Sequence, residues 1–98
     1  MSEETVLSLW HGRIAIPPRT MAQILSEVAE QFNVSVADLK GPARFRCIVY
    51  PRQDAMWRMV NEGRWSLPQI GRFFNRDHTT VIWAWRQVEK RNALEQAA

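Results

Sequence analysis

The most chemically versatile segment of the sequence is Asp77-His78-Thr79-Thr80, which combines a carboxylate, an imidazole and two hydroxyl groups. A carboxylate can accept a hydrogen bond from cytosine N4, and an imidazole can bond to a base or a phosphate. A threonine methyl group can pack on the methyl group of thymine. These residue types therefore suit contacts to base edges in double-stranded DNA.

The same side chains do not combine into a catalytic or metal-binding site. Cys47 is the only cysteine, so a zinc site would have no further thiolate ligands. Asp77 and His78 are adjacent, and the carboxylate cannot readily support the imidazole while the imidazole serves a distant thiol. The sequence also contains no Gly-x-x-x-x-Gly-Lys-Ser/Thr loop for nucleotide binding. We expect no enzyme activity, no metal ion and no cofactor.

The charge distribution points to a polyanionic partner. Residues 1–39 hold two arginines against five acidic residues, a net charge of −3. Residues 40–91 hold eleven lysines and arginines against four acidic residues, a net charge of +7. Eleven of the thirteen basic residues are arginine, whose planar fork suits phosphates and base edges. A solvated basic surface is the alternative interpretation, and charge alone does not separate the two.

The 98 residues are enough for one small domain with a buried core, since 46% of them are hydrophobic. No apolar run is long enough to span a membrane, and the acidic start Met1-Ser2-Glu3-Glu4 is unlike a signal peptide. We therefore expect a cytoplasmic protein. The domain plan is an N-terminal arm over 1–18, a folded domain over 19–92 and a tail over 93–98. The arm carries Leu7, Leu9 and Trp10, which could pack on the domain or form a homodimer contact.

Apolar spacing and capping residues predict an all-α fold, a small helical bundle. Helices are expected over 20–32, for one short turn after Ser35, and over 47–62, 66–74 and 77–91. Thr20, Ser66 and Asp77 are the expected N-caps. The side chains expected to face the core are Met21, Ile24, Leu25, Val28, Phe32, Met56, Met59, Val60, Leu67, Ile70, one of Phe73 and Phe74, Val81, Ala84, Trp85 and Val88.

The last two predicted helices are joined by the tight turn Asn75-Arg76, which is typical of a helix-turn-helix. In that motif the first residues of the second helix meet base edges in the major groove. Here those residues are Asp77, His78, Thr79 and Thr80.

From Met21 to Glu89 the chain resembles the C-terminal DNA-binding domain of DnaA, the bacterial replication initiator. The matching stretches are Val36-Ala37-Asp38-Leu39-Lys40-Gly41, Pro51-Arg52-Gln53, Ser66-Leu67-Pro68-Gln69-Ile70-Gly71, Arg76-Asp77-His78-Thr79-Thr80-Val81 and Ala84-Trp85-Arg86. The resemblance implies binding of double-stranded DNA at a DnaA-box-like site. It also implies a role in regulating replication or transcription, by a free-standing domain such as a phage or prophage regulator, because the ATPase module of the family is missing.

The resemblance assigns roles to particular residues. It implies that Arg44 enters the minor groove and that Asp77, His78 and Thr79 contact bases in the major groove. The residues implied to contact the DNA backbone are Arg46, Arg52, Gln53, Leu67, Pro68 and Thr80.

Four departures from the family pattern bear on sequence preference. Besides the missing ATPase module, the turn Phe74-Asn75-Arg76 is one residue shorter than the family's usual double glycine. Phe45 stands where a small polar or basic residue is usual, and Val60 where a basic phosphate contact is common.

A protein-interaction module is the alternative function. In that interpretation the helix-turn-helix is only a scaffold, and the arm and the outward-facing Trp83 and Trp57 bind a replication or regulatory protein.

Overall fold

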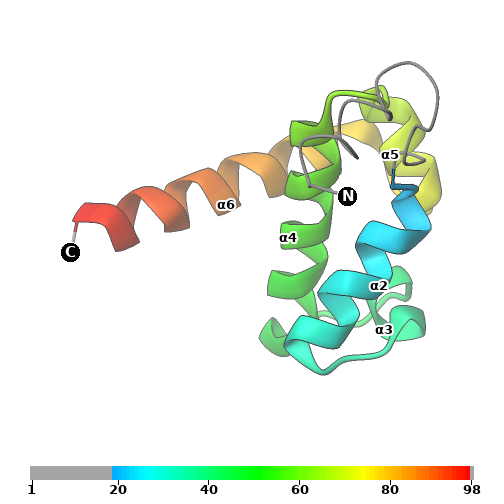
Figure 1. Cartoon of the computed structure of the whole chain (residues 1–98), viewed down its shortest axis with the longest axis horizontal. Coiled ribbons are helices and arrows are strands. Elements are labelled where there is room, and N and C mark those ends of the chain that lie inside the picture. Colours follow the sequence, from blue (N-terminus) through cyan, green and yellow to red (C-terminus); the bar gives the residue numbers. More distant parts are fainter. Residues whose placement is uncertain (1–18, 98) are drawn as a thin grey trace, which may run out of the picture.

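The computed structural model describes residues 19–97 and contains five α-helices and no strand in that range (Figure 1). The all-α prediction is confirmed. The N-terminal arm, with its proposed packing or dimer contact, lies outside the described residues. The helices are α2 (Met21–Phe32), α3 (Val36–Lys40), α4 (Arg46–Glu62), α5 (Leu67–Phe73) and α6 (His78–Ala97).

Helix α2 begins at a capping box, as the sequence predicts. The Thr20 hydroxyl accepts from the Gln23 backbone N–H at 3.1 Å, and the Gln23 side chain accepts from the Thr20 N–H at 2.8 Å. The prediction that Phe32 faces the core is wrong, because this side chain is 45% exposed. Phe32 lies in the last turn of α2, after which Val34 and Leu39 supply the apolar contacts to the core.

Helix α4 is the central element, and α2, α3, α5 and α6 all pack against it (Figure 1). Its buried face includes Ile48, Ala55, Met56 and Met59, so the predicted inner positions of the two methionines are confirmed. Val60 is partly buried against the same core. This helix therefore carries both the loop that precedes it and the helix-turn-helix that follows.

The α5 to α6 connection is a tight helix-turn-helix turn. Ser66 and Gln69 form a second capping box at the start of α5. Asn75 takes the left-handed conformation, with φ of 58°, and the Arg76 N–H donates to the Gly71 carbonyl oxygen at 2.7 Å. Phe74, fully buried, anchors the turn in the core. A Cβ at Gly71 would lie 2.6 Å from the Arg76 carbonyl oxygen, so only glycine fits there.

Helix α6 differs from its prediction in two ways. It continues to Ala97, so residues 93–97 are helical rather than a tail, and this end projects beyond the bundle (Figure 1). Val81, Ala84 and Val88 are buried as expected. Trp85, however, is only half-buried and is not part of the core. Its indole N–H donates to the Asn61 side-chain oxygen at 3.0 Å, so the ring lies at the edge between α4 and α6.

Candidate nucleic-acid interface

The first residues of α6 form an exposed polar surface. Asp77, His78, Thr79 and Thr80 are all exposed. The Asp77 carboxylate accepts from the His78 backbone N–H at 2.7 Å and from the Thr79 hydroxyl at 3.0 Å. The Asp77 side chain thus binds the first N–H of α6 and a side-chain hydroxyl, while the Thr80 N–H donates to the Asp77 backbone oxygen at 3.0 Å, so the predicted side-chain N-cap stays a prediction. The Thr79 hydroxyl is turned toward Asp77, which leaves the methyl group of Thr79 as the apolar feature of this surface.

These hydrogen bonds also hold the charge of Asp77. The Thr79 hydroxyl and then the His78 N–H lower the pKa of Asp77 below its ordinary value. The His78 Nδ1 atom lies 3.0 Å from the Asp77 carboxylate and adds to the same effect. Asp77 therefore stays ionised at neutral pH and acts only as a hydrogen-bond acceptor, as a contact to cytosine N4 requires.

The loop before α4 presents a second exposed surface. Arg44, Phe45 and Arg46 are all exposed, and Phe45 is exposed over 73% of its surface. Within residues 19–97, neither Arg44 nor Arg46 has an ion-pair or hydrogen-bond partner for its side chain. These two cations are therefore available for an anionic ligand.

Arg52, one of the predicted phosphate contacts, has a different environment. Its side chain is only 6% exposed and lies under the loop that carries Arg44. Its Nε donates to the Leu39 carbonyl oxygen at 2.6 Å, and its Nη2 lies 2.9 to 3.1 Å from three further carbonyl oxygens, those of Asp38, Gly41 and Ala43. The donors of Arg52 hold the 38–43 segment against α4, and its phosphate contact stays a prediction.

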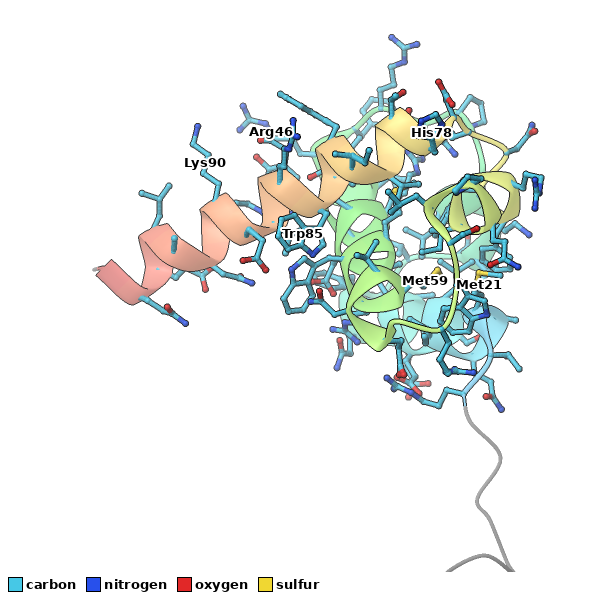
Figure 2. The ribbon with its side chains drawn as sticks, turned by 90° about the horizontal axis from the view of Figure 1, so that it is seen from above. Met21, Arg46, Met59, His78, Trp85 and Lys90 are labelled. Carbon is cyan, nitrogen blue, oxygen red and sulfur yellow. The ribbon has the colours of Figure 1, made fainter. Side chains whose placement is uncertain are left out.

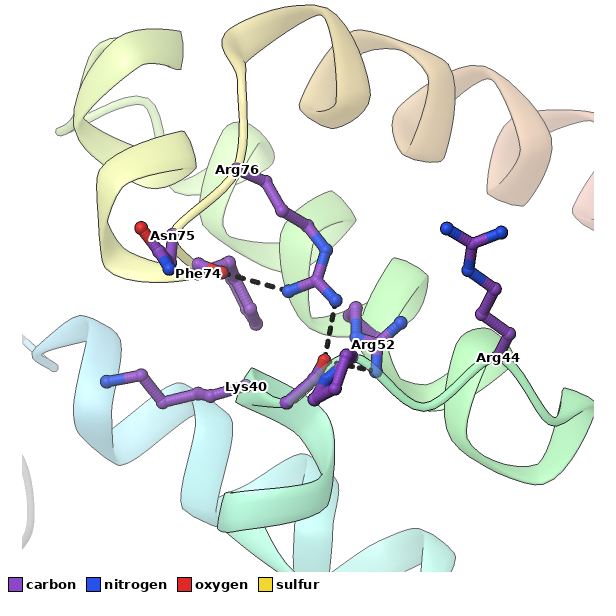
Figure 3. A pocket seen from close by; sticks show the side chains of 8 residues that line it. Lys40, Arg44, Arg52, Phe74, Asn75 and Arg76 are labelled. Carbon is purple, nitrogen blue, oxygen red and sulfur yellow. Dashed lines mark hydrogen bonds between the residues drawn. The ribbon is translucent and has the colours of Figure 1, made fainter.

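Arg76 completes the connection between the two surfaces and was not identified as a functional residue from the sequence. Its Nη2 donates to the Gly41 carbonyl oxygen at 2.6 Å and its Nη1 to the Phe74 carbonyl oxygen at 2.9 Å (Figure 3). An open pocket of about 510 Å³ separates the loop from the turn. Its lining residues are Lys40, Gly41, Pro42, Arg44, Arg52, Phe74, Asn75 and Arg76.

Gln53 is held in a defined orientation on the half-buried side of α4. The Arg91 Nη1 atom donates to the Gln53 side-chain oxygen at 2.8 Å. The Arg91 guanidinium is also 4.2 Å from the centre of the Tyr50 ring, a cation–π contact. With its oxygen occupied by Arg91, the Gln53 amide has its NH₂ donors left for another acceptor, such as a phosphate.

The remaining predicted backbone contacts lie at helix starts. Pro68 is exposed in the first turn of α5, Leu67 is partly buried against the core, and Thr80 is exposed in the first turn of α6. The structure therefore brings these residues to the ends of the two helices of the helix-turn-helix, and it leaves Pro68 and Thr80 accessible.

The tryptophans divide into bound and exposed rings. The Trp57 indole N–H donates to the Glu89 carboxylate at 2.6 Å, so Trp57 and Trp85 both join α4 to α6. Trp83 is 58% exposed on the opposite side of α6, as predicted. Figure 2 shows Trp85 directed toward the bundle and Lys90 directed away from it.

The described part of the chain offers few other features for chemistry or membrane insertion. Within residues 19–97, no three His, Cys, Asp or Glu side chains cluster as metal ligands would. In the same range, no helix combines the length and apolarity needed to cross a bilayer. Cys47 is an exposed free thiol in the first turn of α4.

Comparison with known proteins gives consistent matches to one family. The family described as "Bacterial dnaA protein helix-turn-helix" matches residues 21–88. The chromosomal replication initiator protein DnaA of Cereibacter sphaeroides is 42% identical over 77 residues, which is 78% of this chain and 17% of that protein. The DnaA protein of Wolbachia pipientis is 48% identical over 71 residues, 71% of this chain and 15% of that protein.

The matches cover most of this chain but only a small part of its relatives. The DnaA protein of Lactococcus lactis shows the same proportions, with 44% identity over 70% of this chain and 15% of that protein. The chain therefore spans less than a fifth of the length of these relatives. A match to a helix-turn-helix family supports DNA binding for the domain described here.

Proposed function

Because this chain belongs to the bacterial DnaA helix-turn-helix family, we propose that it binds double-stranded DNA at sites that resemble DnaA boxes. The start of α6 enters the major groove, where Asp77, His78 and Thr79 contact base edges. Arg44 enters the adjacent minor groove. Recognition in two grooves at once gives the sequence preference.

The observation that carries the proposal is the pairing of an exposed polar helix start with two arginines that have no side-chain partner among residues 19–97. Asp77, His78 and Thr79 are exposed at the start of α6, Arg44 is exposed in the loop before α4, and Arg46 is exposed as the first residue of α4. Arginines that lack carboxylate partners in the free protein can release counterions from DNA on binding.

The DNA backbone is contacted by a second group of residues, which fixes the position of the domain on the duplex. We assign this role to Arg46, Gln53, Leu67, Pro68 and Thr80. Arg52 contributes mainly through the loop that it holds, because most of its donors already bond to carbonyl oxygens.

Occupancy of DNA, rather than a nucleotide-driven change, is the proposed mode of action. The sequence contains no Gly-x-x-x-x-Gly-Lys-Ser/Thr loop, so binding by this chain needs no ATP. By occupying box-like sites, the domain regulates replication or transcription, or competes with a full-length initiator for the same DNA.

The direct test is a titration of a box-containing duplex and a scrambled duplex at two salt concentrations. Preference for the box at both concentrations, with affinity for both duplexes falling as salt rises, supports the proposal. Equal affinity for the two duplexes would show that the domain binds DNA without reading its sequence. No binding to either duplex would contradict the proposal altogether.

A protein-interaction function is the second candidate, and the exposure of Trp83 favours it. A tryptophan that is 58% exposed is a common anchor at protein interfaces. Replacing Trp83 with Ala while measuring box affinity separates the candidates. Retained affinity leaves Trp83 free for a protein partner, and lost affinity assigns it to the DNA surface.

A further inference from the structure

Two arginine side chains meet at one backbone oxygen between the Arg44 loop and the turn before α6 (Figure 3). The Nη2 atoms of Arg52 and Arg76 lie 3.0 Å and 2.6 Å from the carbonyl oxygen of Gly41. Arg76 and Gly41 are 35 positions apart in the sequence. This contact, which we call the Gly41 latch, is therefore a tertiary connection and not a feature of one turn.

The Gly41 latch is an unusual way to satisfy buried charge. Within residues 19–97, no carboxylate lies within ion-pair distance of Arg52 or Arg76. Burial lowers the pKa of both arginines, and the charge of Arg76 lowers the pKa of Arg52 further. Two like charges placed together without an anion oppose folding. The hydrogen bonds from the two arginines to backbone carbonyl oxygens have to offset this repulsion.

The guanidinium of Arg76 donates to two backbone carbonyl oxygens at once, which a shorter or single-donor side chain cannot do. Its planar fork holds the Gly41 and Phe74 carbonyl oxygens at the same time, at 2.6 Å and 2.9 Å. Phe74 is fully buried, so the fork ties the loop to a fixed point in the core.

The two segments joined by the latch carry the residues assigned to the two DNA grooves. Gly41 lies three positions before Arg44, and Arg76 directly precedes Asp77. On the far side of the turn, the Arg76 N–H donates to the Gly71 carbonyl oxygen at 2.7 Å, so the Arg76 backbone is tied to α5. The Arg76 side chain therefore bridges the loop and the start of α6 from a fixed backbone position.

We propose that Arg76, supported by Arg52, is a positioning residue that fixes the spacing between the Arg44 loop and the start of α6, and thereby contributes to sequence preference without contacting DNA. The proposal rests on the proposed function of the domain. A loop fixed before binding loses less conformational entropy when both grooves are contacted together. Removal of the latch is expected to reduce the preference for the correct sequence more than the general affinity for DNA.

The geometric part of the proposal can be tested without DNA. Spin labels at Arg44→Cys and Thr79→Cys, in a Cys47→Ser background, report the distance between the loop and α6. Arg76→Met removes both hydrogen bonds and keeps a long side chain, so we expect the distance distribution to broaden. Arg72→Met, which removes an exposed arginine from neighbouring α5, is the matched control and should leave the distribution unchanged. An equal width for the Arg76→Met and unmodified proteins overturns the proposal.

The DNA-binding part is tested by the same variant in two backgrounds. Arg76→Met should lower the ratio of box to scrambled affinity by about tenfold, with the salt dependence unchanged. In an Arg44→Ala background it should lower that ratio by less than about threefold, because the residue that it positions is already gone. Arg76→Lys, which keeps the charge but not the fork, should lose preference in the same way and guards against a folding defect in Arg76→Met.

The remaining outcomes separate the alternatives. Equal losses for both duplexes, with a salt slope smaller by about 1, would mean that Arg76 contacts a phosphate and would overturn the proposal. A lower melting temperature with unchanged preference would mean that the latch serves the fold only. If the unmodified protein shows no box preference, the proposed function fails, while the spin-label widths still decide whether the latch fixes the loop.

Discussion

At the scale of single residues, the hydroxyl and the methyl group of Thr79 have different roles, which the sequence alone does not distinguish. The Thr79 hydroxyl donates to the Asp77 carboxylate at 3.0 Å. This bond ties the hydroxyl to the side chain of Asp77, while the methyl group of Thr79 is free to meet a base. Sequence reasoning identified both residues, but only the geometry shows which part of Thr79 is committed to the helix.

Replacing Thr79 with Ser or with Val therefore separates the two functions. Thr79→Ser keeps the hydrogen bond and removes the methyl group, so box affinity should fall by about 1 kcal/mol while stability changes by no more than about 0.5 kcal/mol. Thr79→Val keeps a methyl group and loses the hydrogen bond, so stability should fall more than box affinity. Melting curves and box titrations of both variants provide the measurement.

A DNA change completes the Thr79 test. Uracil in place of the contacted thymine should weaken binding of the unmodified protein but not of Thr79→Ser, because the same contact has already been removed. Additive losses would mean that Thr79 does not touch that methyl group. The shorter turn at Asn75 would then have moved α6 away from the family's position on DNA.

Arg46 and Arg52 are both arginines, but one is exposed and the other is buried, so we expect different roles for them. Arg52→Ala should lower the free energy of unfolding by about 1–3 kcal/mol or more, because buried carbonyl oxygens lose their donors. Arg46→Ala removes an exposed arginine, so we expect unchanged stability and a salt slope smaller by about 1 for box and scrambled duplexes alike. Denaturant titrations and binding at several salt concentrations distinguish the two. Equal stability of the two variants would contradict the structural role of Arg52.

At the scale of helices, the sequence predicts the elements well where local rules decide. Thr20 and Ser66 cap helices through their side chains, as the residue types indicate. The wrong predictions are those of burial, which depends on how the helices pack together. Phe32 has helical spacing with the core but lies in the last turn of α2, and Trp85 lies at the edge between α4 and α6. Periodicity gives the direction of a side chain and not what covers it.

The helix-turn-helix turn depends on one glycine. Gly71→Ala would place a Cβ 2.6 Å from the Arg76 carbonyl oxygen, and backbone atoms on both sides cannot yield easily. We expect a loss of stability of about 1–3 kcal/mol and reduced box affinity, because α5 and α6 must separate. Gly63→Asn is the control, since this position is left-handed and open and Asn tolerates that conformation. Unchanged melting of Gly71→Ala would mean that the turn is looser than described.

At the scale of the whole molecule, the described residues pair some arginines with carboxylates and leave others unpaired. Asp54 pairs with Arg58, and Glu62 lies near Arg19, so acidic groups of α4 neutralise arginines away from the loop. Arg44 and Arg46 have no such partner within the described residues. The net charge of the 40–91 segment could be counted from the sequence, but the placement of its unpaired part depends on the fold.

The distal end of α6 is the part of the described chain that the proposed function does not need. It projects beyond the bundle, and Leu94 is 64% exposed (Figure 1). Deleting residues 93–98 should lower the helical content but change the melting temperature by less than about 2 °C, because residues 93–96 are all exposed and lie outside the core. Box affinity should stay the same, since Arg91 and its bond to Gln53 are retained.

Circular dichroism, melting curves and box titrations test these expectations, and sedimentation gives the molecular mass. Leu94→Glu is the matched point variant. A change from the mass of two chains to the mass of one chain, after either change, would show that this end of α6 joins two copies. Weaker box binding of the same variant would show that the dimer takes part in DNA recognition.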